Sequence, residues 1–194
     1  MRVTNILVML FLLGFSSVYA QQDVKVGDLY TFGDNTKGVV FYVDEEGHGL
    51  AVSTIQDKRR WEDESHYVYC QDIVTIPNEL LPILDLYVGQ GKINTSYILS
   101  QLKDVKPIAA KYCREEGSEW YLPSAGELYR LMVANADGTI DKTLKEHKYK
   151  KIEGSYWTSS EYGQGEAWRI DETGRVKHSS KLATRVSARA IRQF

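Results

Sequence analysis

The sequence is poor in the residues that build metal and thiol sites, with two cysteines and four histidines among 194 residues. The histidines are scattered, and the number and spacing of the cysteines do not match a cysteine-based zinc site. A Gly-x-Ser-x-Gly nucleophile motif is absent, and the only Gly-x-Gly-Lys stretch lacks the spacing of a phosphate-binding loop. We therefore expect no metal, no cofactor and no catalytic residues.

A charge excess of one sign is also missing, because the formal net charge is −2 at pH 7. This balance gives no electrostatic reason to expect nucleic acid or an anionic membrane as a partner. After residue 20, no apolar run approaches the roughly 20 residues that span a bilayer as a helix. We expect no transmembrane segment in the mature chain.

Residues 1–20 have the three parts of a cleavable secretory signal. Arg2 gives the positive start, Ile6 to Phe15 form an unbroken apolar run, and Val18 and Ala20 are the compact residues before a cleavage point. The apolar run is about half the length of a membrane-spanning helix. We expect a signal peptide over 1–20 and a secreted, periplasmic or cell-surface protein.

The cysteines, Cys70 and Cys113, both lie in the mature part. In an oxidising compartment such a pair can form a disulfide. The alternative is two separate buried thiols.

Residues 21–194 contain no repeat and no Pro/Gly/Ser-rich linker, which predicts a single domain. Residues 38–53 (GVVFYVDEEGHGLAVS) predict a β-hairpin with its turn at 44–49. Residues 56–90 lack periodicity and predict a long excursion with little regular structure.

The middle of the chain predicts three helices. Thr95 is a candidate cap for a helix through Ile98 and Leu102, and Pro107 suits the start of a second helix that stops at Gly117. Ser124 and Glu127 have the spacing of a capping box at the start of a third helix, which ends at 135–138.

The last third of the chain is strand-like. Strands are predicted at 156–160, at 167–170 and, after a turn at 171–174, at 175–177. Residues 185–194 alternate, which predicts that Val186, Ala188 and Ala190 share one face.

In this order the motifs GVVFYVDEEGHGLAVS, WYLPSAGEL, YWTSSEY, AWRI and VSARAIRQF resemble the Lcl C-terminal domain family, which is related to the major paralogous domain group. The resemblance covers most of the mature chain apart from much of 56–90. It implies an α+β class with the C-type lectin-like fold, in which curled antiparallel sheets are flanked by helices and the chain ends lie close together. It also implies export from bacteria and noncatalytic recognition.

The calcium-binding triplets of sugar-binding C-type lectins, Glu-Pro-Asn or Gln-Pro-Asp and Trp-Asn-Asp, do not occur here. Calcium-dependent sugar binding by that route is therefore not expected. Alternating oxygens at Asn135, Asp137, Thr139 and Asp141 leave two alternatives, a weak calcium site near Asp137 or a solvated junction between helix and loop.

Four aromatic residues lie outside the periodic segments and are candidates for ligand binding: Trp61, Tyr67, Tyr69 and Tyr162. An aromatic ring on a charged loop suits a sugar ring or a partner protein. The alternative for Trp61 is a side chain folded down onto the core. Trp120, Trp157 and Trp168 are expected in the core.

The sequence-based hypothesis is an adhesion or recognition module that binds a glycan or a protein partner through loops. One alternative is an envelope enzyme acting on polysaccharide or peptidoglycan through two carboxylates about 5 to 9.5 Å apart. Another is a structural subunit of a surface assembly, with an edge strand that pairs with a neighbour.

Overall fold

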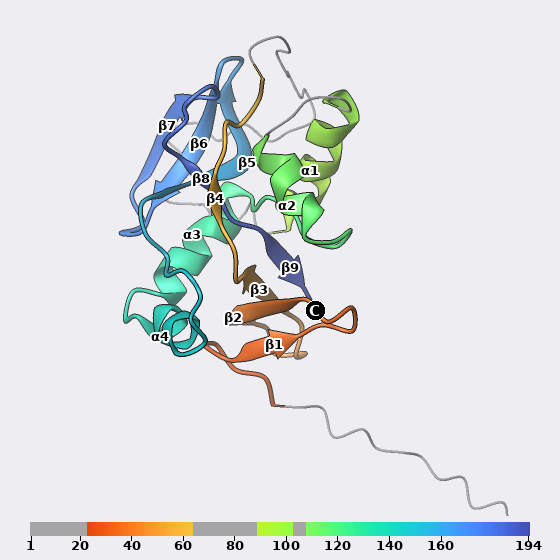
Figure 1. Ribbon diagram of the computed structural model, residues 1–194, viewed down its shortest axis with the longest axis vertical. Coiled ribbons are helices and arrows are strands. Elements are labelled where there is room, and N and C mark those ends of the chain that lie inside the picture. The colour runs from red at the N-terminus through yellow and green to blue at the C-terminus, as the bar shows by residue number, and fades with distance from the viewer. Residues whose placement is uncertain (1–22, 64–88, 103–107) are drawn as a thin grey trace, which may run out of the picture.

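The computed structural model describes residues 23–63, 89–102 and 108–194 (Figure 1). The expected signal peptide, residues 1–20, lies outside this range. The described chain is α+β, as predicted, with two curled sheets and helices packed beside them. No helix in the described ranges has the length and apolar character to cross a membrane.

The first sheet joins the two ends of the described chain. Its order is β1-β2-β3-β9, all antiparallel, with β1 at Leu29–Thr31, β2 at Lys37–Val43, β3 at Gly49–Ser53 and β9 at Ile191–Gln193. The predicted hairpin is therefore confirmed as β2 and β3. The β-branched residues on β2 suit a strand that is buried along most of its length.

The second sheet has the order β4-β8-β5-β6-β7. Its strands are β4 at Asp57–Lys58, β5 at Ser155–Gly163, β6 at Glu166–Asp171, β7 at Val176–Ser180 and β8 at Ser187–Ala188. The β5–β8 pairing is parallel and the others are antiparallel. The strands predicted at 156–160, 167–170 and 175–177 are confirmed as β5, β6 and β7.

The predicted strand at 185–194 is divided between the two sheets, with β8 in one and β9 in the other. The predicted face of Val186, Ala188 and Ala190 is buried, as expected. The opposite positions, Ser187 and Arg189, are buried too, because this segment passes between both sheets.

The helices are α1 at Gln90–Gln101, α2 at Ala109–Glu115, α3 at Ala125–Ala134 and α4 at Thr139–Glu146. The capping box of Ser124 and Glu127 is present at the start of α3, as predicted. The predicted cap at Thr95 is wrong, because α1 begins after Gly89 and Thr95 lies within it. Ile108 is the N-cap of α2, and Pro107 lies outside the described residues.

Thr95 has a different role, because its hydroxyl donates to the Leu122 carbonyl and accepts from the Leu122 N–H. This pair joins α1 to the segment before α3. The α4 helix was not predicted. Its buried Ile140 and Leu144 are four residues apart and pack with Phe41 and Val39 of β2 in one core cluster.

Two clusters of buried side chains form the core. One centres on Trp61, Trp120 and Trp157, and the other gathers side chains from α3, α4, β2 and β6. Trp120, Trp157 and Trp168 are at most 1% exposed, so their predicted core positions are confirmed. The two sheets lie toward opposite ends of the long axis, with β7 at one end and β1 near the other (Figure 1).

Candidate functional site

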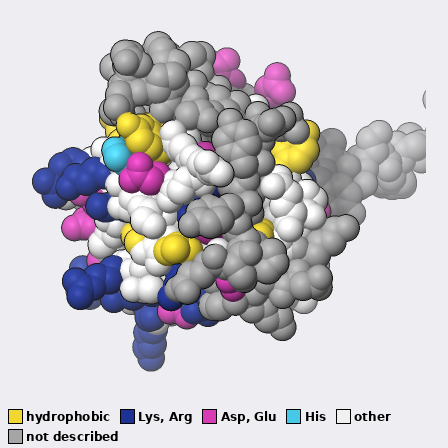
Figure 2. All heavy atoms as spheres, turned by 90° about the horizontal axis from the view of Figure 1, so that it is seen from above, with side chains coloured by type: hydrophobic (Ala, Val, Ile, Leu, Met, Phe, Trp, Pro, Cys, Tyr) yellow, Lys and Arg dark blue, Asp and Glu magenta, His cyan; other side chains and the backbone are white. Residues whose placement is uncertain are grey.

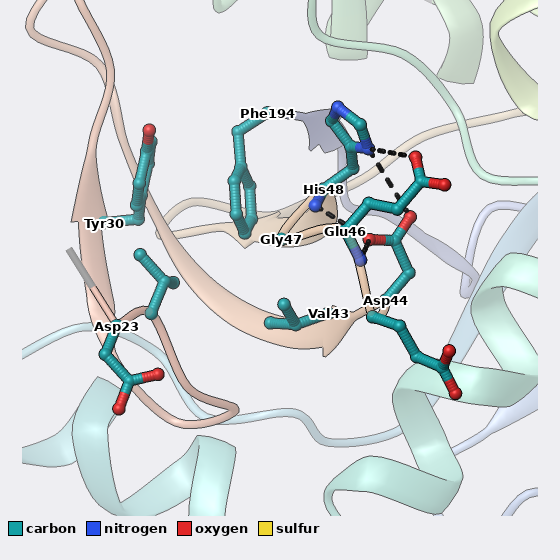
Figure 3. Close-up of a pocket in the computed structure, with 10 residues that line it drawn as sticks. Asp23, Tyr30, Val43, Asp44, Glu46, Gly47, His48 and Phe194 are labelled. Atoms are coloured by element: carbon teal, nitrogen blue, oxygen red, sulfur yellow. Dashed lines mark hydrogen bonds and ion pairs between the residues drawn. The ribbon is translucent and has the colours of Figure 1, made fainter. Parts of the chain in front are cut away.

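An open hollow of about 600 Å³ lies where the first described residues meet the last one (Figure 3). Its lining comes from Asp23 and Val24, from Tyr30 on β1, from residues 43–48 at the β2–β3 turn, and from Phe194. We call this site the acidic hollow. It is a candidate docking site, and no sequence motif marked it.

The β2–β3 turn forms one wall because of Asp44. Its Oδ1 accepts hydrogen bonds from the backbone N–H groups of Glu46 and His48, both at 2.9 Å, and its own N–H donates to the His48 carbonyl at 2.8 Å. Gly47 takes the positive φ of 86° that the turn requires. The turn is therefore ordered by its own short polar side chain.

The ring of Phe194 forms the floor of the acidic hollow. Its N–H and carbonyl exchange hydrogen bonds of 3.1 Å with Gly49, and its ring stacks on Tyr30 with centroids 4.5 Å apart. A Cβ atom at Gly49 would lie only 2.4 Å from the Phe194 ring. The missing side chain at Gly49 therefore lets the ring sit between the acidic hollow and a smaller one of about 300 Å³.

Carboxylates surround this aromatic floor. Asp44 and Glu46 stand on one flank and Asp23 on the other (Figure 3), and Glu45 also lines the acidic hollow. Lys25 pairs with Asp23 at 3.0 Å, and His48 Nδ1 lies 3.7 Å from both Asp44 and Glu46. An apolar floor with an acidic rim suits a cationic side chain that has a long aliphatic stem.

A second open space, of about 470 Å³, runs along β1. It is lined by Val24 and by residues 28–31. Val24 and Tyr30 also line the acidic hollow, so the two spaces are neighbours. Within the described ranges β1 pairs only with β2, so this space borders an unpaired strand edge.

Trp61, the leading ligand candidate from the sequence, is fully buried. Its indole N–H donates to the Thr158 carbonyl at 2.8 Å, and the Lys181 ammonium lies 4.5 Å from the ring centroid. The prediction of a surface contact is therefore wrong in the described structure, and the alternative of a ring folded onto the core is what the structure has. Local sequence could not decide between the two alternatives, because the partners Thr158 and Lys181 come from the last third of the chain.

Beneath Trp61 lies a buried ionic cluster. Lys181 contacts Glu161 and lies 3.6 Å from Glu62, and all three side chains are at most 3% exposed. A macromolecular substrate has no access to carboxylates buried to this degree.

Tyr67, Tyr69 and Cys70 lie outside the described residues. Cys113 is a buried free thiol, which agrees with the alternative to a disulfide for this residue. Burial raises its pKa well above the ordinary value, which keeps it protonated and unreactive.

Tyr162 is half-buried and belongs to an aromatic cluster at the end of the molecule that carries β7. Its ring stacks on His178 with centroids 3.8 Å apart, and Trp168 packs edge-on against both. His178 Nδ1 lies 3.1 Å from Glu166. Figure 2 shows a histidine beside hydrophobic and acidic side chains on this end of the molecule. Because Tyr162 is half-buried, contact with a ligand stays a prediction for it.

The oxygens suggested for calcium have other hydrogen-bond partners. Asn135 Oδ1 accepts from the Asp141 N–H, Asp137 Oδ1 from the Thr139 N–H, and Asp141 Oδ1 from the Ile152 N–H, all at 2.7–2.9 Å. These side chains order the start of α4 and its contact with residue 152, which fits the solvated-junction alternative. Within the described ranges, no group of His, Cys, Asp and Glu side chains has the arrangement of a metal site.

No protein-family model and no curated protein matches the chain. A solved structure of a fimbrial protein from Bacteroides ovatus is similar in fold, with a TM-score of 0.59 and 14% sequence identity. The similarity covers 88% of this chain and 48% of the fimbrial protein, so this chain spans about half the length of that structure.

Proposed function

We propose that this chain is an exported subunit of a bacterial surface assembly of the fimbrial kind. The observation that carries the proposal is the fold shared with a fimbrial protein over 88% of this chain. The acidic hollow and the unpaired β1 edge give such a subunit a place to receive a neighbour. The expected signal peptide supplies the export route.

Within this proposal the chain is a member of the Lcl C-terminal domain family with a C-type lectin-like fold. The segments that carry the resemblance are adjacent in space, which supports it. Tyr121 of WYLPSAGEL exchanges two backbone hydrogen bonds of 3.0 Å with Ile191 of the closing segment. Pro123 of the same motif accepts from Ser159 of YWTSSEY at 2.7 Å.

The proposed role is recognition of a protein partner without catalysis. The exposure of the carboxylates supports this role over that of an enzyme. A glycosidase that acts on a polymer needs two carboxylates in an open cleft. Glu62 and Glu161, which share Lys181 as a neighbour, are at most 2% exposed. The acidic side chains of the acidic hollow border an aromatic floor and a strand edge, which suits docking of another chain.

The test is to locate the chain on cells that express it. An epitope tag placed at the exposed turn of His147 and Lys148, after α4, lies outside the acidic hollow. We expect immunogold labelling of surface filaments and recovery of the tagged chain in the sheared filament fraction. A cytoplasmic protein of similar abundance is the control. Recovery of the chain only with the cytosol would overturn the proposal.

A further inference from the structure

Each sheet has two terminal strands, β1 and β9 in the first and β4 and β7 in the second. β9 is also bridged to Tyr121, and β4 is only two residues long. The other two, β1 and β7, lie toward opposite ends of the molecule (Figure 1). Within the described part of the chain, β1 pairs only with β2, and β7 pairs only with β6. An unpaired edge presents backbone N–H and C=O groups to any strand that approaches.

On β1 the outward groups belong to Leu29 and Thr31. In an antiparallel ladder, hydrogen-bonded residue pairs alternate with pairs whose backbone groups point away from each other. The backbone N–H of Phe32 donates to the Thr36 carbonyl at 2.9 Å, and the Asp28 carbonyl accepts from the Val40 N–H at 2.9 Å. The backbone N–H and C=O groups of the even-numbered residues therefore point toward β2. The N–H and C=O groups of Leu29 and Thr31 therefore point toward the open edge.

On β7 the same alternation applies with the other parity. The Arg175 carbonyl accepts from the Asp171 N–H at 3.1 Å, and the Lys181 N–H donates to the Gly165 carbonyl at 3.0 Å. The backbone N–H and C=O groups of the odd-numbered residues therefore point toward β6. The backbone groups of Val176 and His178 therefore point outward. Their two-residue spacing matches that of Leu29 and Thr31.

We propose that copies of this chain join head to tail by strand addition, with β7 of one copy pairing antiparallel to β1 of the next. In the register that satisfies both edges, Leu29 faces His178 and Thr31 faces Val176. This inference rests on the proposed function, and it names a second copy of the chain as the partner of the acidic hollow.

This register places the side chain of Lys177 at the acidic hollow of the neighbouring copy. Residues directly opposite each other in an antiparallel pair point to the same face. Lys177 lies opposite Tyr30, which lines the acidic hollow. The stem of Lys177 then lies along the aromatic floor, and its ammonium group reaches the carboxylates of the β2–β3 turn.

The distribution of charge favours pairing β7 with β1 over pairing β7 with β7 or β1 with β1. Residues 175–181 (RVKHSSK) contain no acidic residue, whereas Asp23, Asp28, Asp44, Glu45 and Glu46 surround β1 and its adjoining space. Arg175 pairs with Asp171, and Glu166 with His178, which leaves Lys177 as the cation at that edge without an ion pair among the described residues. Pairing β7 with β7 brings like charges together, and so does pairing β1 with β1.

The contact surfaces differ and lie toward opposite ends of the molecule, so the contact is heterologous. A heterologous contact that does not close into a ring generates a filament. Repeated pairing of β7 with β1 from copy to copy would therefore build a filament.

The test is sedimentation velocity of the purified mature chain over a concentration series at low salt. We expect species larger than dimers to grow with concentration. Lys177→Glu and Glu46→Lys each weaken association by at least about tenfold, and the double variant restores it, because the swapped charges meet again at each contact. Lys142→Glu, on an exposed position of α4, is the control and leaves association unchanged.

A backbone variant tests the strand pairing itself. Thr31→Pro removes an outward N–H group that the β1–β2 ladder does not use, so the fold tolerates it and association falls. An equimolar mixture of Thr31→Pro and Lys177→Glu stops at the dimer, because each variant keeps one intact contact surface. If Thr31→Pro does not fold, the charge-swap series decides by itself.

A chain that stays monomeric at every concentration overturns the inference, and so does assembly that Lys177→Glu and Glu46→Lys leave unaffected. If such a chain is nevertheless recovered in surface filaments, the proposed function holds and this interface is wrong. Head-to-tail assembly of a chain found only in the cytosol gives the reverse result, with the interface right and the surface role wrong.

Discussion

Glu116 shows how one partly buried carboxyl makes stability depend on pH. It is the C-cap residue of α2 and accepts a hydrogen bond of 2.7 Å from the Ser53 hydroxyl. Burial raises its pKa from 4.5 to about 7, against the opposing effects of the Ser53 hydrogen bond and the Arg189 charge. Because the folded-state pKa is the higher one, this carboxyl favours folding when protonated. That contribution is complete below pH 4.5 and is lost as the pH rises to about 7.

Glu116→Gln keeps an acceptor for Ser53 and removes the charge. We expect the free energy of unfolding to rise by about 1 to 3 kcal/mol at about pH 8 and to stay unchanged at about pH 4. Urea titrations at both pH values measure this difference. Glu115→Gln, at the exposed neighbouring position, is the control. An equal gain at both pH values would show that the charge is not the cause.

At the residue scale, sequence patterns predict contacts that stay local. Ser124 and Glu127 are three residues apart, and their capping box formed as predicted. Trp61 is the opposite case, because its hydrogen-bond acceptor Thr158 is 97 positions away. Charged neighbours along the chain suggested an exposed ring, and only the folded chain brings the partners that bury it.

At the scale of elements, the crossing of α1 over the start of α3 depends on Gly91. A Cβ atom there would lie 2.2 Å from Glu127 Oε2 and less than 3 Å from the backbone at Ser124 and Leu122. Glu127 is fully buried and accepts from the N–H groups of Gly89 and Ser124. The Glu127 carboxylate of the capping box therefore also accepts a hydrogen bond from Gly89, the N-cap residue of α1.

Gly91→Ala sets helix propensity against this contact. Alanine favours a helix over glycine by about 1 kcal/mol. The clash involves backbone atoms, which cannot move aside cheaply, so we expect a net loss of about 2 to 4 kcal/mol in unfolding free energy. Thermal and urea unfolding measure it, with Ser96→Ala on the exposed side of α1 as the control. A stabilised variant would mean that α1 shifts to make room.

Elements were predicted best where periodicity and turn signals coincide. The hairpins β2–β3 and β6–β7 have both, and both formed. The start of α1 was missed because Thr95 looks like a cap but faces Leu122 inside the fold. Periodicity also cannot show that residues 185–194 leave one sheet and enter the other, since each sheet's partner strand lies far away in sequence.

For the molecule as a whole, the acidic hollow could not be predicted, because it joins the first described residues to the last. Tyr30 and Phe194 stack only after β9 pairs with β3 and β1 pairs with β2. Nothing local to either residue distinguishes it from other strand aromatics. Sites built from both ends of a chain depend on topology.

Arg189 lies where the chain passes from β8 to β9, and its side chain is 1% exposed. Its guanidinium donates to the Ser53 carbonyl of β3 at 2.9 Å, to Gln56 Oε1 at 2.7 Å, and to the carbonyls of Lys150 and Lys151 at 3.0 and 3.2 Å. One planar group therefore joins the first sheet to the loop before β5 of the second. Five donors in a fixed fork suit this arrangement, and a lysine cannot reproduce it.

Arg189→Ala leaves buried carbonyls unpaired and is expected to lower the unfolding free energy by at least about 3 kcal/mol, with a smaller loss for Arg189→Lys. Because the arginine joins both sheets, the urea midpoints from tryptophan fluorescence and far-UV circular dichroism should fall together. Arg185→Ala, at an exposed position just before β8, is the control. Two separated midpoints in the alanine variant would show instead that the sheets unfold independently, and the arginine would then stabilise only the sheet whose transition moved.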